Sequence, residues 1–106
     1  MASKTNPSLV TDVNGNPIPV LRPVGNLNVS YTAVAAQSGS ISENIRVVRL
    51  VCTTDCYVLF GTNPTATASD MILLAGVPEY FEVENGIKIS AIRYNTDGTL
   101  NITEMA

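Results

Sequence analysis

Hydrophobic and polar residues alternate with a period of two along most of the chain after residue 27. This period is typical of β-strands that bury one face. It is clearest at residues 80–84, where Phe81 and Val83 point one way while Glu82 and Glu84 point the other. Further strands are expected at residues 28–36, 45–51, 56–60, 71–75 and 87–94, and around Leu100 and Ile102. The pattern therefore predicts seven or eight short strands.

Turn signals separate these strands at intervals of about ten residues. Asn85-Gly86 favours a tight hairpin because glycine tolerates positive φ, and residues 95–98 are expected to close the last hairpin. No longer stretch shows convincing helical periodicity. We therefore predict an all-β fold, an antiparallel β-sandwich or jelly-roll-like module, rather than a parallel α/β fold.

The first 27 residues differ from the rest, because they contain four of the six prolines and no clean alternation. Residues 12–17 form a turn signature, and Pro17, Pro19 and Pro23 favour extended backbone beyond it. We therefore divide the chain into an extended N-terminal arm, residues 1–27, and a β-sandwich domain, residues 28–106.

Aliphatic side chains recur along this arm, and disordered segments are usually poorer in them. We expect the arm to lie on another protein, although disorder is the simpler interpretation of a proline-rich terminus. A segment stiffened by proline loses less entropy on binding than a flexible one. The residues expected to carry this contact are Leu9, Val10, Ile18, Val20 and Leu21, with Arg22 pairing with an acidic partner.

Composition and charge narrow the function classes. Charged residues make up 14% of the chain, against roughly 25% in a typical soluble domain, and a weakly charged surface suits contact with protein. The net charge is −3 and the basic residues form no run, so we expect no nucleic-acid binding. No apolar stretch approaches the roughly 20 residues of a membrane-spanning helix, and we expect a soluble product made in the cytoplasm without a signal peptide.

The sequence offers little for catalysis, since histidine, the commonest general base, is absent. Glu82 and Glu84 share a strand face about 7 Å apart, a spacing that a glycosidase could use, but we favour a solvated strand face beside a hairpin as its explanation. Tyr80 and Tyr94 are candidates for exposed rim residues of a sugar-binding surface. We predict a protein that is not an enzyme and holds no cofactor.

Cys52 and Cys56 are the only cysteines. A cross-strand disulfide is geometrically conceivable, but a reducing compartment argues against it. A metal site would need further histidine or cysteine ligands, which the chain lacks. We favour two small, buried, unpaired hydrophobic residues at strand ends, and we predict no metal site.

The hairpin at residues 48–64, VRLVCTTDCYVLFGTNP, is followed by LAGVPEYF and GIKISAI strands. In this order the chain resembles short structural proteins of tailed bacteriophages over residues 45–104, the arm excluded. The resemblance is to packing and turn residues rather than to an active site. It is greatest to the small cement (decoration) proteins on the capsids of short-tailed phages, and similar β modules occur in neck, tail and fibre proteins.

The resemblance implies a virion protein on the capsid surface that clamps neighbouring major capsid subunits, often as a homo-oligomer, through extended termini. The residue patterns point the same way, because a clamp needs many weak contacts and no chemistry. A neck, tail or fibre module is the first alternative, and a carbohydrate-binding module is the second.

Overall fold

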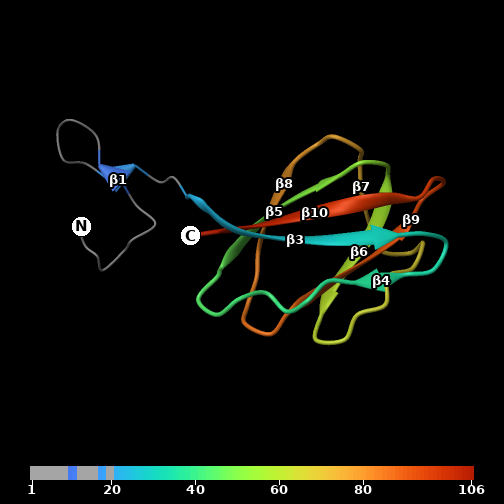
Figure 1. Ribbon diagram of the computed structural model, residues 1–106, viewed down its shortest axis with the longest axis horizontal. Coiled ribbons are helices and arrows are strands. Elements are labelled where there is room, and N and C mark those ends of the chain that lie inside the picture. The colour runs from blue at the N-terminus through green and yellow to red at the C-terminus, as the bar shows by residue number, and fades with distance from the viewer. Residues whose placement is uncertain (1–9, 12–16, 19–20) are drawn as a thin grey trace.

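The computed structural model describes residues 10–11, 17–18 and 21–106. This part of the chain contains ten strands and no helix (Figure 1). The strands are β1 (Val10–Thr11), β2 (Pro17–Ile18), β3 (Pro23–Tyr31), β4 (Ala36–Gln37), β5 (Val47–Cys52), β6 (Cys56–Gly61), β7 (Met71–Leu73), β8 (Glu79–Glu82), β9 (Lys88–Arg93) and β10 (Gly98–Met105). The predicted all-β class is confirmed.

Eight of these strands form two antiparallel sheets of four, in the orders β3-β10-β5-β8 and β4-β9-β6-β7. Four pairs are nested along the chain: β3 with β10, β4 with β9, β5 with β8, and β6 with β7. This is the pairing of one long hairpin rolled into two sheets, which is a jelly roll. The predicted antiparallel sandwich is therefore correct.

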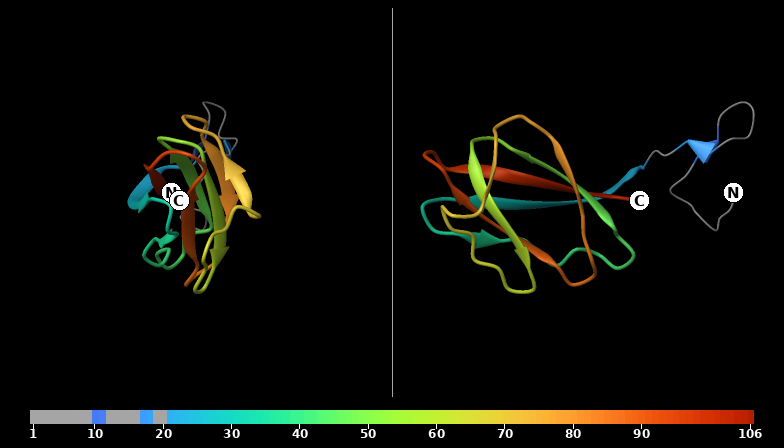
Figure 2. Two further views of the ribbon diagram at one scale, coloured as in Figure 1. Left: turned by 90° about the vertical axis from the view of Figure 1, so that its right-hand side faces the viewer. Right: turned by 180° about the vertical axis from the view of Figure 1, so that it is seen from behind.

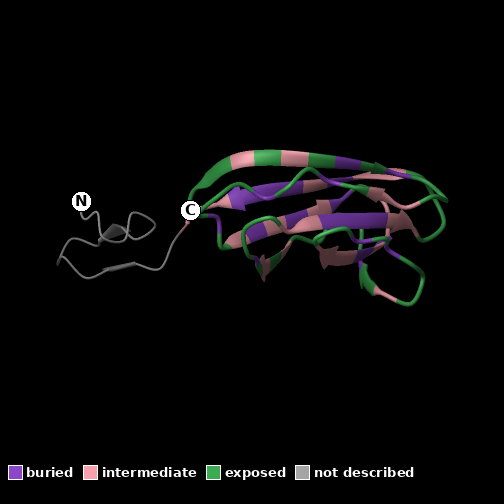
Figure 3. Cartoon of the chain, turned by 90° about the horizontal axis from the view of Figure 1, so that it is seen from below, coloured by how far each residue is buried: buried purple, intermediate pink, exposed green. Residues whose placement is uncertain are grey.

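The core lies between the two sheets and draws on both. Its largest fully buried aliphatic side chains are Leu50, Leu100 and Ile102 from the first sheet and Leu73 and Ile89 from the second. Buried residues alternate with more exposed ones along β3 and β5, as Figure 3 shows. β9 and β10 instead contain runs of three buried residues, 89–91 and 102–104.

Two polar contacts tie loops to the ends of the first sheet. The hydroxyl of Tyr31, a buried residue, donates to the carbonyl of Thr54 at 2.5 Å and accepts from the Thr54 amide at 3.2 Å. At the other end Glu104, also buried, accepts from the amide and hydroxyl of Ser42 at 2.7 and 3.0 Å. Gly25 leaves room for this carboxylate, since a Cβ there would lie 2.6 Å from Glu104 Oε1.

The first sandwich strand begins earlier than the sequence indicates. β3 starts at Pro23, so residues 23–27, which the prediction places in the arm, pair with β10 (Figure 2). Proline is tolerated at the first residue of an edge strand, where its missing N–H breaks no ladder. The strand then ends at Tyr31, and the predicted continuation to residue 36 is wrong, because the chain bends away before β4.

Ser90 departs from the simple alternation, because it lies between the core residues Ile89 and Ala91 and its side chain is nevertheless fully buried. Its hydroxyl accepts from the Ala66 amide at 2.9 Å, in a loop that crosses the outer face of the second sheet. Gln37 holds the same loop by donating to Asn63 Oδ1 at 2.8 Å and to the Pro64 carbonyl at 2.7 Å. A hydroxyl suits this position because it satisfies the loop amide.

Candidate interaction surface

The outer face of the first sheet carries a straight row of polar side chains. Backbone register places Asn26 beside Thr103, Thr103 beside Arg49, and Arg49 beside Tyr80. Thr103 donates to Asn26 Oδ1 at 2.9 Å, and Asn101 donates to Asn28 Oδ1 at 3.1 Å one row along. The face is therefore rich in amides and hydroxyls rather than in charge.

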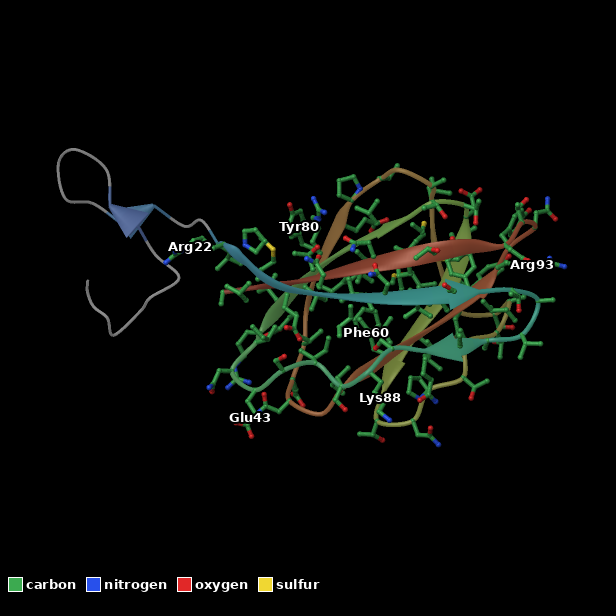
Figure 4. All side chains as sticks on the ribbon, in the orientation of Figure 1. Arg22, Glu43, Phe60, Tyr80, Lys88 and Arg93 are labelled. Carbon is green, nitrogen blue, oxygen red and sulfur yellow. The ribbon has the colours of Figure 1, made fainter. Side chains whose placement is uncertain are left out.

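A hollow of about 400 Å³ lies over this row, and we call it the Arg49 hollow. It is lined by Pro23, Asn26, Arg49, Tyr80, Thr103 and Met105. Arg49 Nε is buried there without a hydrogen-bond partner, and Tyr80 exposes 60% of its surface (Figure 4). A ligand with a hydrogen-bond acceptor and a surface for aromatic contact suits these groups better than a purely apolar one.

Exposed apolar side chains gather at the β7 edge of the second sheet. Residues 71–78 contain no charge. Ile72 is the register partner of Tyr57, whose ring lies 5.8 Å from that of Tyr94. Asp55 links the segment after β7 to the end of β9. Its side-chain Oδ1 accepts from the Ala75 amide at 2.8 Å, and its backbone carbonyl accepts from the Tyr94 amide at 3.0 Å.

We call this surface the β7 patch. Its members are Tyr57, Met71, Ile72, Leu74, Val77 and Tyr94. Five of the eight large hydrophobic side chains that are exposed in the described part of the chain belong to it, namely Met71, Ile72, Leu74, Val77 and Tyr94. Grouped exposure of this kind marks interaction surfaces more often than scattered exposure does.

Glu82 and Glu84 lie on the rim of a smaller hollow of about 280 Å³. Both side chains are exposed, and the remaining lining residues, Phe60, Val83 and Ile87, are apolar. The Phe60 ring contacts that of Phe81 at a centroid distance of 5.4 Å. This hollow therefore offers two exposed carboxylates together with the Phe60 ring, and the predicted opposite directions of Glu82 and Val83 are confirmed.

Cys52 and Cys56 are both free and buried, as the favoured interpretation of the sequence had it. Burial raises the pKa of the Cys56 thiol to about 12 and also raises the pKa of Cys52. These thiols stay protonated at neutral pH and are poor nucleophiles. Across residues 21–106 no three acidic or cysteine side chains gather where a metal ion could sit. The described residues also form no helix that could cross a membrane.

The arm residues predicted to bind a partner are described only in part. Leu9 and Val20 lie outside the described residues. Val10 and Ile18 are register partners in the two-stranded sheet of β1 and β2. Leu21 is half-buried and Arg22 is exposed, with its backbone paired to Ala106 by two hydrogen bonds of 2.9 Å. The predicted role of these residues in binding stays a prediction.

Comparison with known proteins gave no relative for this chain. The comparison covered family models, curated proteins and solved structures, and none of the three gave a match. Its surfaces must therefore be interpreted from their own chemistry.

Sequence reasoning identified Tyr80 and Tyr94 as rim residues, and both are exposed. It missed the β7 patch, although the charge-free run at residues 71–78 was a usable signal. It also missed the Arg49 hollow, whose residues come from four strands and meet only through sheet register. No local pattern could have identified that row.

Proposed function

We propose that the protein is a non-enzymatic structural component of a virion, a cement protein that binds neighbouring major capsid subunits and stabilises the head. The β7 patch carries this proposal, because it gathers five exposed apolar side chains, four of them from the charge-free run at residues 71–78. Such a surface gains free energy by burial against another protein. The resemblance of residues 45–104 to phage structural proteins names the partner.

The fold is compatible with this role without specifying it. Jelly rolls occur in viral capsid proteins, in lectins and in cupins, so a shared fold does not determine a function. Weak contacts made by many copies on a symmetric particle add up through multivalency, which a small patch can exploit. The arm residues Ile18, Val20 and Leu21 would add a second contact.

The test is binding of the full chain to purified phage particles. We expect wild-type protein to sediment with particles at a fixed ratio to the major capsid protein. The double variant Ile72→Asp with Leu74→Asp should reduce that binding at least tenfold, because it places two charges in the β7 patch. Both side chains are exposed, so the variant should fold.

Tyr80→Asp is the matched control, since it adds a charge at an exposed apolar residue on the other sheet. It should leave binding to particles unchanged. Equal loss of binding in both variants, or equal retention, contradicts the role given to the β7 patch. A second double variant, Ile18→Asp with Val20→Asp, tests the arm independently of the patch.

The Arg49 hollow favours one other function, binding of carbohydrate. Sugars are recognised by an aromatic surface next to amide, hydroxyl and guanidinium groups, and Tyr80, Asn26 and Arg49 supply these groups. A glycan array probed with the full chain tests this alternative. Binding that is lost in Tyr80→Ala and kept in Tyr94→Ala would support it, because Tyr94 lies outside the hollow.

A further inference from the structure

Four strands form the edges of the two sheets, and they differ greatly in length. β4, β7 and β8 have two, three and four residues, whereas β3 has nine. Short edge strands are a common protection against pairing with another chain. β3 lacks this protection, and Figure 3 shows it as a long outermost strand with alternating exposure.

The sequence of β3 also lacks the residues that usually block an edge. No charged residue occurs between Pro23 and Ser42, and the only proline of β3 is its first residue. Charged side chains, above all lysine, and internal prolines are the usual protection of exposed edges. The edge of β3 therefore has no charged side chain and no proline over residues 24–31 that would block pairing with another strand.

Hydrogen bonding along β10 fixes which backbone groups of β3 are free. The Thr53 amide donates to the Thr99 carbonyl, so the backbone of Thr99 faces β5. Ala106 exchanges two hydrogen bonds with Arg22, so the backbone of Ala106 faces the β3 side. Because these directions alternate along an antiparallel strand, Leu100, Ile102 and Glu104 bond to β3.

Their register partners on β3 are Val29, Leu27 and Gly25. The intervening residues Asn26, Asn28 and Ser30 then direct their amides and carbonyls away from the sheet. Among residues 21–106, no hydrogen bond outside the ladders uses the backbone of these three residues. The free edge therefore offers three donors and three acceptors in a row.

We propose that β3 pairs with β3 of a second copy of this chain, antiparallel about a two-fold axis at Asn28. In this register Asn28 lies opposite Asn28 of the second copy, and Asn26 lies opposite Ser30. All three are residues whose free groups face the edge, so every pair exchanges two hydrogen bonds. The sheet β3-β10-β5-β8 of one copy then joins the same sheet of the second copy to form one continuous sheet.

Exposed side chains at the two ends of β3 favour a second copy over a foreign strand. Val24 is 57% exposed at its beginning, and Val34 is 74% exposed three residues beyond its end. Two-fold pairing brings the beginning of each strand to the end of the other, so each Val24 approaches the region of the other copy's Val34. No like charges meet, because the edge has none.

The pairing closes on itself. Each chain has one long edge strand, β3, and the two-fold axis pairs the β3 strands of the two copies with each other. No long edge is then left for a third copy, so a dimer forms rather than a fibre. This inference depends on backbone geometry and is independent of the proposed function.

The oligomeric state of the full chain tests it, measured by sedimentation equilibrium over a wide concentration range. Wild-type protein should form a dimer that dissociates on dilution. Asn28→Pro should be monomeric yet folded, because it removes an N–H from the free edge and none from the ladder with β10. Asn28→Ala keeps that N–H and should remain dimeric.

Charge at the two-fold position distinguishes self-pairing from other interfaces. Asn28→Lys and Asn28→Glu should each be monomeric, and an equimolar mixture of the two should form a heterodimer, because only opposite charges then meet. A wild-type chain that is monomeric at all concentrations overturns the proposal. A dimer that persists in Asn28→Pro also overturns it.

Disulfide trapping tests the register. Residues opposite each other in a hydrogen-bonded pair have Cα atoms about 5.5 Å apart, within the range of a disulfide. Asn28→Cys should therefore form a covalent dimer on mild oxidation. Ser30→Cys, about 13 Å from its own copy in this register, should not. Equal trapping of both variants contradicts the assigned register.

Discussion

The two sheets of this sandwich have similar inner faces and very different outer faces. The first sheet carries a hydrogen-bonded network of three amide side chains, Asn26, Asn28 and Asn101, around the buried hydroxyl of Thr103. The second sheet is covered in part by its own loop at residues 62–70 and is apolar where the cover ends, along β7. Alternation of polar and apolar residues along the strands underlies both sheets, so this pattern alone does not distinguish their outer faces.

The difference shows what an outward position in a strand requires. Where it faces water, as at Asn101, a polar side chain is solvated and contributes little to stability. Where the chain's own loop covers it, as at Ser90, the residue is small and must satisfy the loop. Where it is apolar and uncovered, as at Ile72, we propose that another molecule binds there.

The largest predicted effects test whether the inner faces are equivalent. Ile102→Ala in the first sheet and Ile89→Ala in the second should each lower the free energy of unfolding by about 2–5 kcal/mol. Both side chains are fully buried in one core. Urea denaturation measures the change. A loss below about 1 kcal/mol in only one variant would mean that the sheets do not share a core.

The next prediction compares matched outward positions on the two sheets. Ser90→Ala should cost about 1–3 kcal/mol, because it leaves the buried Ala66 amide without an acceptor. Asn101→Ala on the first sheet should cost less than about 1 kcal/mol, since water can replace its exposed hydrogen bonds. Urea denaturation of both variants measures these losses in the free energy of unfolding. Equal losses would contradict the proposed difference between the covered outer face at Ser90 and the open outer face at Asn101.

Sequence alone predicted most of the sandwich strands, because alternation fixes both period and inward face, as at Phe81 and Val83. It failed wherever a distant segment decided the outcome. Ser90 is buried by the loop at residues 62–70, which begins 28 residues before it in the sequence. Thr103 contacts Asn26 across a separation of 77 residues. The sequence prediction places Pro23 in the arm, because its pairing at a sheet edge depends on β10.

Cys56, at the hairpin that passes from one sheet to the other, gives a prediction on pH. Its pKa is raised from 9.0 to about 12 by burial, so the folded state holds the proton more tightly than the unfolded state. Its contribution to stability is therefore fully present below pH 9 and is lost as the pH rises from 9 towards 12. At pH 10 the loss is on the order of 1 kcal/mol.

Comparison of unfolding at pH 8 and pH 10 isolates this contribution. The free energy of unfolding should differ less between pH 8 and pH 10 in Cys56→Ala than in the wild type. The other groups that titrate in this range are present in both proteins and cancel in the comparison. A pH dependence unchanged by Cys56→Ala would show that this thiol is not shielded where the sheets meet. The folded wild type should also resist alkylation at pH 8, and unfolding should restore the reaction.

The smallest predicted effect concerns the exposed ion pair at the end of the sandwich far from Arg22 (Figure 4). Arg93 donates to Asp97 at 2.7 Å, and both side chains are largely open to solvent. Asp97→Ala should lower the free energy of unfolding by less than about 0.5 kcal/mol, because water and salt screen such pairs. Repeating the measurement at high salt should reduce even that difference. A loss above about 1 kcal/mol that survives salt would mean that exposed polar groups stabilise this fold as buried ones do, and the contrast between Asn101 and Ser90 would then need another cause.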